Sequence, residues 1–456
     1  MEPIPVINHP STTTAVGGKI HVRLTSGFYQ NLRRAISGTL MLLFFGLAWI
    51  QVDGQPWLLF DFAERRIHLF GAQFSWYDLP LMAGLMIAGT ALLFFMAVGW
   101  GRLWCGFACP QSIWTWLFIR IEQFTEGRAA TRRKAETKPL QGTRLFRRVI
   151  KHLLWAVLAF ATALTFTGYF VPIREMVGSI ATFELSVFTS SWLLIMAALT
   201  YLNGGLIREK VCFHMCPYSR FQGVMFDRDT RTVSYDAARG EPRNHKVQQA
   251  QTGAAGDCVD CGLCVQVCPT GIDIRNGLQY ECIDCAACID ACDAVMDKIG
   301  RPRGLIDFRS ENQMAKTPSP LWRPRLLTYL LVLLASVGAI LYGFTQRTEL
   351  LIEVRRDRQQ LYEELADGTI CNSYRLKVES FTETPETIEV SINAPMDLVV
   401  HGLSNLQPSQ VNAWLPYRIC SQTRAITGKQ PLTFMLSNSQ SRASKETVFM
   451  TPSSLR

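Results

Sequence analysis

Charged side chains are scarce in this 456-residue chain. They make up 18% of it, whereas hydrophobic residues make up 48%. Soluble globular domains ordinarily contain about 25% charged residues. The shortage argues against a wholly soluble protein and favours a membrane protein with sizeable aqueous parts. The net charge is nevertheless +9. Because the positive charges are not interleaved with aromatic residues and no nucleic-acid motif accompanies them, we expect no nucleic-acid partner.

The sequence also lacks the short motifs of common soluble enzymes. It contains no P-loop, no glycine-rich dinucleotide fingerprint and no hydrolase triad signature. Its seven histidines are scattered, and no matched pair lies within the apolar segments to ligate a haem. With these chemistries excluded, cysteine is the residue type left to carry the function.

Five apolar segments are long enough to cross a bilayer, the first being the shortest. They are residues 35–50, 80–100, 149–171, 183–207 and 326–344. Ten Lys and Arg residues lie between positions 102 and 148, and few lie in the loops on the opposite side. This asymmetry places the basic loop and the N-terminus in the cytoplasm. Five crossings then place the C-terminus in the periplasm.

The apolar segments divide the chain into seven predicted parts. They are a cytoplasmic tail (1–34), a four-span membrane domain (35–227), a linker (228–255), a ferredoxin-like domain (256–300), a second linker (301–325), a fifth transmembrane helix (326–346) and an outer domain (347–456). In the outer domain apolar residues alternate with polar ones, as at 374–378 and 388–392, and turn residues separate the runs. This pattern predicts a small β-sandwich of the immunoglobulin-like kind.

Eight cysteines form two runs with the spacing of bacterial ferredoxins. They are Cys258, Cys261, Cys264 and Cys268, then Cys282, Cys285, Cys288 and Cys292. In this pattern three cysteines of a run hold one [4Fe–4S] cluster, and the fourth reaches the neighbouring cluster. The predicted ligand sets are therefore Cys258, Cys261, Cys264 and Cys292 for cluster 1, and Cys282, Cys285, Cys288 and Cys268 for cluster 2. Asp293 stands where the first run has Pro269. The alternative is a pair of zinc-ribbon sites, which two complete runs disfavour.

Four further cysteines form two matched C-x3-C-P pairs, each just past the end of an apolar segment. They are Cys105 with Cys109, and Cys212 with Cys216. On a helix, residues i and i+4 share one face. Ordinary packing is one interpretation, because free cysteine behaves as a small hydrophobe. Brought together, four thiolates would form a soft site suited to an iron–sulfur cluster, Cu(I) or zinc. His214 and Met215 are additional copper-ligand candidates, although each on its own is expected to be structural.

Cys371 and Cys420 stand apart in the outer domain. They could pair in an oxidising compartment, but the sequence does not establish the distance between them. A free thiol or an outer metal site is the alternative.

Taken together, these features resemble the cytochrome c oxidase accessory protein family CcoG, also called FixG or RdxA. The most specific stretches are residues 104–110, 211–217 and 258–292. The resemblance implies a cupric reductase that supplies Cu(I) during assembly of cbb3-type oxidases in the bacterial inner membrane. It assigns Cys105, Cys109, Cys212 and Cys216 to a redox or copper site. It also implies copper ions, oxidase subunits or their assembly factors, and an electron donor as partners, beside the lipid bilayer.

Two other functions stay open at this point. One is a quinol-oxidising subunit similar to NapH-type membrane ferredoxins, which share the twin C-x3-C-P pairs but lack the outer sandwich. The other is a non-enzymatic copper chaperone or assembly scaffold. The cysteine spacing on its own predicts two [4Fe–4S] clusters and iron–sulfur electron transfer. The resemblance adds the possibility of copper at the twin pairs, beside a third cluster.

Overall fold

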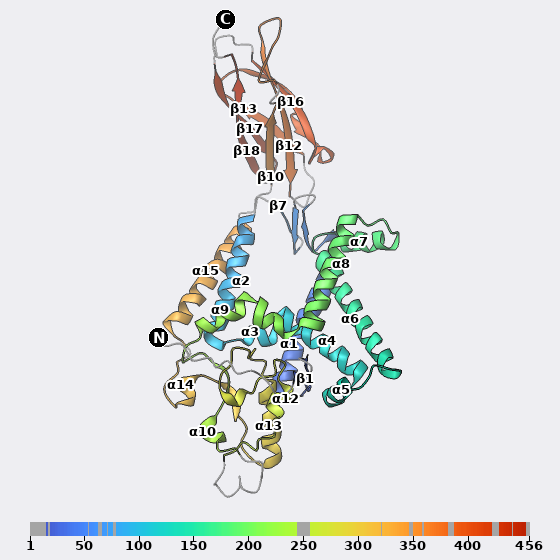
Figure 1. Cartoon of the computed structure of the whole chain (residues 1–456). Coiled ribbons are helices and arrows are strands. Elements are labelled where there is room, and N and C mark those ends of the chain that lie inside the picture. Colours follow the sequence, from blue (N-terminus) through green and yellow to red (C-terminus); the bar gives the residue numbers. More distant parts are fainter. Residues whose placement is uncertain are drawn as a thin grey trace. The chain divides into compact units, whose positions relative to one another are not determined.

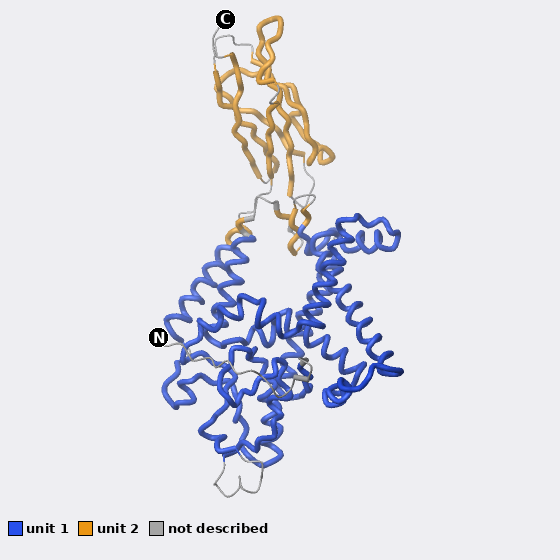
Figure 2. Tube along the Cα trace, in the orientation of Figure 1, with its two compact units in different colours: residues 1–60, 82–341 blue, residues 61–81, 342–456 orange. Residues whose placement is uncertain are grey.

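The computed structural model divides into two compact units (Figure 2), residues 1–60 with 82–341 and residues 61–81 with 342–456. The residues that it describes are 15–16, 19–52, 54–62, 66–70, 72–75, 79–243, 256–320, 322–345, 350–357, 360–381, 387–421, 428–439 and 441–452. Each unit has a hydrophobic core of its own.

The first unit is mainly helical (Figure 1). Its helices of eight or more residues are α1 (Phe28–Leu47), α2 (Leu79–Trp100, which begins in the other unit), α4 (Pro110–Glu126), α5 (Ala129–Glu136), α6 (Thr143–Thr167), α7 (Ile173–Ala181), α8 (Val187–Tyr201), α9 (Pro217–Met225), α13 (Ala287–Ile299) and α15 (Pro324–Thr345, which ends there). α6 packs against α4 and α8. α2 packs against α15, where a side chain at Gly84 would meet Ile340. The long helices thus pack in two groups, α6 with α4 and α8, and α2 with α15.

Four described helical segments are long and apolar enough to cross a membrane. They are Met82–Trp100, Thr143–Thr167, Val187–Ile207 and Pro324–Thr345. They coincide with the second to fifth predicted spans. The first predicted span, residues 35–50, is not among them, so the fifth crossing and the sidedness that depends on it stay predictions.

α1 differs from the predicted span because it begins seven residues earlier and starts with polar turns. Gln30, Arg33 and Ser37 are buried on it. The backbone N–H groups of Tyr29 and Gln30 donate to the Asp290 carboxylate at 3.1 and 2.7 Å. A carboxylate is favourable at a helix N-terminus, where backbone N–H groups lack partners within the helix. The first half of α1 therefore packs against the cysteine-rich domain through polar residues and is not a continuous apolar span.

The cysteine-rich domain uses short elements. They are β8 (Thr232–Tyr235), α10 (Ala237–Gly240), α12 (Leu263–Val267), the 3-10 turn η4 (Ile274–Asn276), α13, β9 (Ile306–Arg309) and α14 (Glu311–Met314). β8 pairs with β9 in antiparallel fashion. Both strands come from segments with no clear apolar period, which the sequence interpretation assigned to linkers. Residues 244–255 of the first linker lie outside the described residues.

The second unit contains a β-sandwich of two antiparallel sheets, with strand orders β10-β12-β16-β14 and β15-β13-β17-β18. The strands are β10 (Leu350–Arg356), β12 (Ile370–Ser380), β13 (Ile388–Asn393), β14 (Leu398–His401), β15 (Asn405–Leu406), β16 (Trp414–Ser421), β17 (Lys429–Ser437) and β18 (Arg442–Met450), and the short β11 (Glu363–Glu364) pairs with β12. β6 (Arg66–Leu69) pairs with β7 (Ala72–Ser75) in the same unit. The two sheets face each other across Leu376, Ile419 and Phe434, which are fully buried. The predicted antiparallel sandwich is confirmed.

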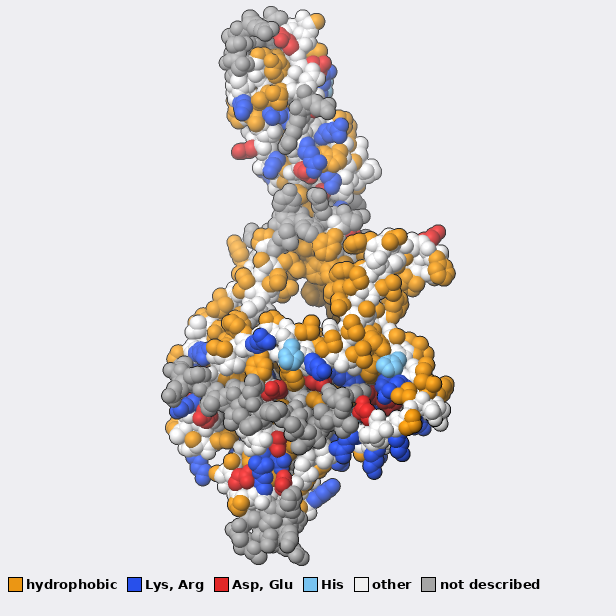
Figure 3. Space-filling model, in the orientation of Figure 1, with side chains coloured by type: hydrophobic (Ala, Val, Ile, Leu, Met, Phe, Trp, Pro, Cys, Tyr) orange, Lys and Arg blue, Asp and Glu red, His pale blue; other side chains and the backbone are white. Residues whose placement is uncertain are grey.

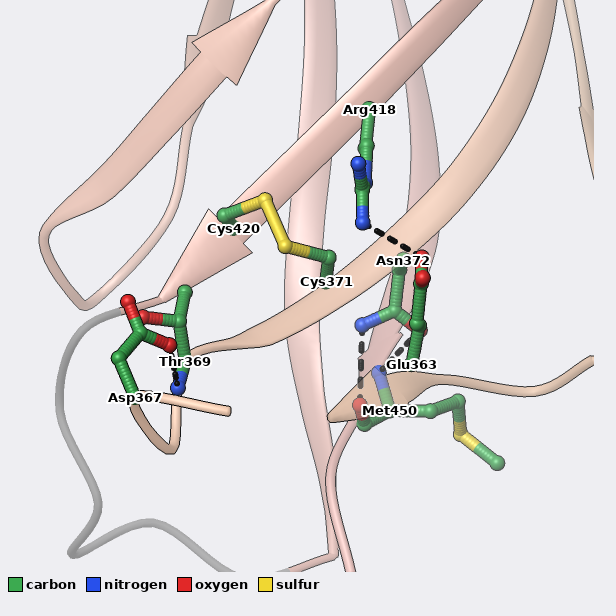
Figure 4. The surroundings of a disulfide bond; sticks show 8 residues. All are labelled: Glu363, Asp367, Thr369, Cys371, Asn372, Arg418, Cys420 and Met450. Carbon is green, nitrogen blue, oxygen red and sulfur yellow. Dashed lines mark hydrogen bonds and ion pairs between the residues drawn. A yellow bond between two sulfur atoms is a disulfide. The ribbon is translucent and has the colours of Figure 1, made fainter. Parts of the chain in front are cut away.

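Cys371 and Cys420 form a disulfide bond between the paired strands β12 and β16 (Figure 4). Beside it the buried Asn372 amide donates to the carbonyl of Met450 at 2.9 Å and accepts from the Met450 N–H at 3.4 Å. Asn372 therefore links the two sheets as a strand backbone would. Of the alternatives left open for Cys371 and Cys420, the structure has the disulfide.

We expect Phe434→Ala to destabilise the outer sandwich by about 3–5 kcal/mol, because it opens a cavity in the fully buried core. Hydrogen exchange of the β12 and β17 amides in the full-length protein measures this loss. Met435→Ala is the matched control, since Met435 follows on the same strand and is 37% exposed. Equal effects of the two substitutions would contradict the assigned core.

Candidate iron–sulfur and twin-cysteine sites

The first cysteine run surrounds a hollow in the cysteine-rich domain. Cys258, Cys261, Cys264 and Cys292 line it together with apolar residues such as Leu305 and Ile306. The loop turns tightly because Asp260 and Gly262 have φ angles of +48° and +62°, a region that glycine and aspartate tolerate best. Cys292 reaches this hollow from α13, the helix that carries the end of the second run.

The second run surrounds a second hollow, which Cys268, Cys282, Cys285 and Cys288 line together with Cys264 of the first run. Asp284 and Ala286 have φ angles of +50° and +57°. They lie 24 residues after Asp260 and Gly262, and each cysteine of the second run likewise lies 24 residues after its counterpart. The two loops thus follow the same backbone path. Ala286 adopts the left-handed conformation that Gly262 adopts in the first loop.

The thiols of each set surround a space and do not meet at one point. Among the residues that the structure describes, no three His, Cys, Asp or Glu side chains converge closely enough to hold one metal ion. Each hollow is lined by the four cysteines that the sequence assigned to one [4Fe–4S] cluster.

Burial raises the pKa of the thiols that line both hollows. It raises the pKa of Cys264 and Cys292 to about 12 and that of Cys285 to about 11. The pKa values of Cys282 and Cys288 are raised well above the ordinary value by the same cause. Because cysteine binds metal as thiolate, loading iron into either hollow must release protons.

The twin C-x3-C-P pairs have closely matched geometry. Cys105 lies in the short helix α3 (Leu103–Phe107), and Cys109 precedes α4. Cys212 lies in the π-helical turn η3 (Val211–Met215), and Cys216 precedes α9. In each pair the second cysteine is extended, with ψ of 127° and 112°, because the residue before a proline avoids the helical region. The second cysteine of each pair therefore lies outside a helix, and the condition under which i, i+4 spacing gives a shared helical face is not met.

A serine locks each pair in the same manner. The Ser112 hydroxyl donates to the Cys105 carbonyl at 2.5 Å. The Ser219 hydroxyl donates to the Cys212 carbonyl at 2.6 Å. Each serine lies seven residues after the cysteine whose carbonyl it contacts. The two C-x3-C-P pairs, which match in sequence, therefore also match in structure.

The twin pairs lie close enough together for their charges to interact. Burial raises the pKa of Cys105 and Cys212 to about 12, the neighbouring thiols add to the rise, and Arg102 opposes it. Cys109 and Cys216 each contribute to the rise at both residues. The sulfur of Cys105 also lies 3.4 Å from the Gln222 side-chain oxygen. His214 and Met215 are exposed.

The twin pairs pack directly against the second cysteine loop. Cys105 belongs to the apolar cluster that contains Cys285 and Cys288. A side chain at Gly106 would come within 2.7 Å of the Ile283 carbonyl oxygen and 2.8 Å of the Asp284 carbonyl oxygen. Only glycine permits this approach, so the first C-x3-C-P element and the second cysteine loop touch backbone to backbone.

Arg102 and Asp284 join these two segments by hydrogen bonds to each other, to β8 and to the second C-x3-C-P element. The Asp284 carboxylate accepts from the backbone N–H groups of Arg102 at 2.8 Å and Val233 at 3.0 Å. The Arg102 guanidinium donates to the carbonyls of Ser219 at 2.7 Å and Cys282 at 3.0 Å, and also to that of Tyr280. Sequence reasoning missed both residues, because their partners lie far away in the chain and no motif marks them.

The cysteine-rich region and the outer domain each match a known protein family. Residues 207–311 match a 4Fe–4S dicluster domain family, and residues 340–452 match the family described as an IG-like fold at the C-terminal of FixG. The dicluster match, the cysteine-lined hollows and the four apolar helices define a membrane-bound iron–sulfur electron-transfer protein.

The curated relatives narrow this class to one family. The nitrogen fixation protein FixG of Rhizobium meliloti is 33% identical over 82% of this chain and 79% of its own length. Proteins RdxA and RdxB of Cereibacter sphaeroides are 35% and 36% identical, over 86% and 82% of this chain and 84% and 82% of their own lengths. The chain belongs to the FixG/RdxA family.

The fourth cysteine of each run lines the hollow of the other run. This pairing predicts how much iron each double substitution removes. Cys261→Ser combined with Cys292→Ser should remove ligands of one cluster and lower the iron content by about four atoms per chain. Cys261→Ser combined with Cys268→Ser should affect both clusters and remove about eight. Iron and sulfide analysis of anaerobic protein decides between the pairings. The reverse order of losses would show that each run holds its own cluster, and Cys371→Ser with Cys420→Ser controls for general effects of cysteine loss.

We expect Arg102→Gln to lower the reduction potential of the adjacent redox centre, because a buried positive charge stabilises the more negative, reduced state. Loss of the forked donor should also destabilise the protein by about 1–3 kcal/mol. Arg102→Lys keeps the positive charge but loses the forked donor. Its reduction potential should therefore stay close to that of the wild type, while its stability to unfolding falls. Redox titration monitored by EPR and thermal unfolding measure the two effects. Equal potentials in the two variants would contradict an electrostatic role.

Proposed function

We propose that this protein is a membrane-bound iron–sulfur reductase that passes single electrons to the twin-cysteine site and there reduces Cu(II) to Cu(I). The two ligand sets proposed for the [4Fe–4S] clusters are those that line the hollows, Cys258, Cys261, Cys264 and Cys292, and Cys282, Cys285, Cys288 and Cys268. When bound, such clusters supply one-electron chemistry at low potential.

The observation that carries the proposal is the shared apolar cluster of Cys105 with Cys285 and Cys288. Because Cys105 and Cys288 both pack against this cluster, the second cluster site and the first C-x3-C-P pair share one apolar surrounding. Cys264, which lines both hollows, connects the two cluster sites. An ordered series of three redox-capable sites is what electron transfer through this domain requires.

The residues of the twin site fit the proposed reduction. Cu(II) gains one electron and becomes Cu(I), and the cluster that donates this electron is oxidised by one electron. Thiolates favour the softer Cu(I) over Cu(II), so the four cysteines would stabilise the product ion. Arg102 lowers the thiol pKa values of Cys105 and Cys212 and thereby makes the thiolate forms more accessible. An external one-electron donor must re-reduce the clusters.

The proposed setting is the bacterial inner membrane, with the cysteine-rich domain in the cytoplasm and the sandwich in the periplasm. The concentration of basic residues between positions 102 and 148 supports this sidedness. Membership of the FixG/RdxA family supports a role in the assembly of cbb3-type oxidases, with oxidase subunits or assembly factors as partners.

Cys109→Ser combined with Cys216→Ser tests the copper step. We expect cupric reduction by the dithionite-reduced protein to fall to the rate without protein, while the iron content of the two hollows is retained. Cu(I) capture by a chromogenic chelator under anaerobic conditions measures the rate. Unchanged reduction would remove the site assignment. Wild-type protein that binds Cu(I) but never reduces Cu(II) would indicate a chaperone or scaffold instead.

The same preparations identify the occupant of the twin pairs. About eight iron atoms per chain correspond to two clusters, and about twelve to a third cluster at the twin pairs. A third cluster would make the twin pairs an electron relay and move the copper site elsewhere. Iron and sulfide analysis beside EPR distinguishes the two compositions.

A further inference from the structure

A large basic hollow lies away from the cysteines, between the end of α4, helix α5 and the start of α6. Its lining includes six Lys and Arg side chains and two carboxylates, from Arg132, Lys134, Lys138, Arg144, Arg147, Arg148, Glu126 and Glu136. Its volume is about 410 Å³. Figure 3 shows Lys and Arg side chains gathered in the region of α5 and the adjoining end of α6. The hollow therefore has a strong excess of positive charge.

Most of this charge is not neutralised by the protein. Arg132 pairs with Glu122, and Arg148 lies 3.5 Å from Glu126. Lys134, Lys138, Arg144 and Arg147 form no ion pair with any residue in the described part of the chain. Arg144 donates to the carbonyls of Pro139 and Ala135, which fixes its side chain without compensating its charge. Four positive charges held together attract an anion.

The position of the hollow points to a ligand at the membrane surface. α6 is a candidate span of 25 residues, and such a helix is about 37 Å long. The hydrocarbon core of a bilayer is about 30 Å thick, so the ends of this helix extend into the headgroup layers. Arg144, Arg147 and Arg148 lie in its first two turns. They are thus placed where lipid phosphates lie.

An apolar stripe begins beside the basic residues on the same helix. Leu145, Val149 and Leu153 follow at intervals of four residues, and they are 49%, 56% and 61% exposed. Residues with this spacing form a continuous line along one helical face. None of these three residues lines the hollow itself. A ligand that occupies both features therefore needs an anionic head for the hollow and a long hydrocarbon tail that leaves it along α6, whereas a free anion or an acidic peptide would use the hollow alone.

We propose that this hollow binds an anionic glycerophospholipid, of the phosphatidylglycerol or cardiolipin type, with its phosphate among Lys134, Lys138, Arg144 and Arg147 and its acyl chain along the apolar stripe of α6. Basic pockets beside transmembrane helices recognise such headgroups. This inference does not depend on the proposed reductase activity, because none of these residues belongs to the cysteine sites.

The lipid site is connected with the twin pairs through one buried carboxylate. Glu122 is fully buried and accepts from Arg132 of α5 and, at 3.0 Å, from Arg208. Arg208 precedes the second pair at Cys212 by four residues. A headgroup that fixes α5 would therefore also stabilise the segment that positions Cys212.

The experiment compares phospholipid retention by full-length protein after exchange from detergent into vesicles of phosphatidylglycerol or phosphatidylcholine. Wild-type protein should retain phosphatidylglycerol preferentially, as measured by native mass spectrometry. Lys138→Gln combined with Arg147→Gln should weaken this retention about thirty-fold, since each cation contributes about 1 kcal/mol at an anionic surface. Lys298→Gln with Lys316→Gln removes the same charge from exposed positions outside the hollow and should leave retention unchanged.

A second variant separates a lipid from a free phosphate. Leu145→Ser combined with Val149→Ser should reduce phosphatidylglycerol retention, and inorganic phosphate should not displace the lipid. Displacement by phosphate together with no effect of the apolar substitutions would overturn the lipid proposal in favour of a simple anion site. Equal losses in the hollow variant and in the Lys298/Lys316 control would show that only overall surface charge matters, and would also overturn it.

Discussion

The Asp284 carboxylate holds together the parts of the molecule on which the chemistry depends. It is 1% exposed, and a buried carboxylate is costly unless donors surround it. Its donors are the backbone N–H groups of Arg102 and Val233, which come from the start of the first C-x3-C-P element and from β8. One side chain of the second cysteine loop thereby fixes a membrane-edge segment and a strand of the cysteine-rich domain. The close approach of Gly106 to the same loop then brings the sulfur sites into one continuous core.

Repetition accounts for much of the architecture. The two cysteine loops repeat after 24 residues, including their positive φ angles at Asp260 and Asp284. The two C-x3-C-P elements repeat with the same proline and the same serine-to-carbonyl hydrogen bond. In the ferredoxin runs each copy supplies part of the other's hollow, since Cys268 lines the second hollow and Cys292 the first. Duplication therefore gives paired sites without a large hydrophobic core.

The sequence predicted the features that depend on local spacing. Cysteine intervals indicated the dicluster domain, period-two alternation indicated the sandwich, and long apolar runs located four membrane-crossing helices. It failed where long-range contacts decide. The polar first turns of α1 are buried against Asp290, which hydropathy cannot reveal. The shared helical face that i, i+4 spacing gives on a helix does not arise at Cys105 and Cys109, because Cys109 precedes a proline and is extended. Arg102 and Asp284 carry no local signal at all.

The chain combines one disulfide with twelve free cysteines, and this has a consequence for how the protein is made. Joining Cys371 to Cys420 needs an oxidant, whereas the other thiols must avoid one, because thiolates exchange readily with disulfides and would scramble. No single solution condition serves both needs at once. Biogenesis must therefore keep the two ends of one polypeptide apart while each acquires its sulfur chemistry, and refolding from a uniform denatured pool should give mispaired material.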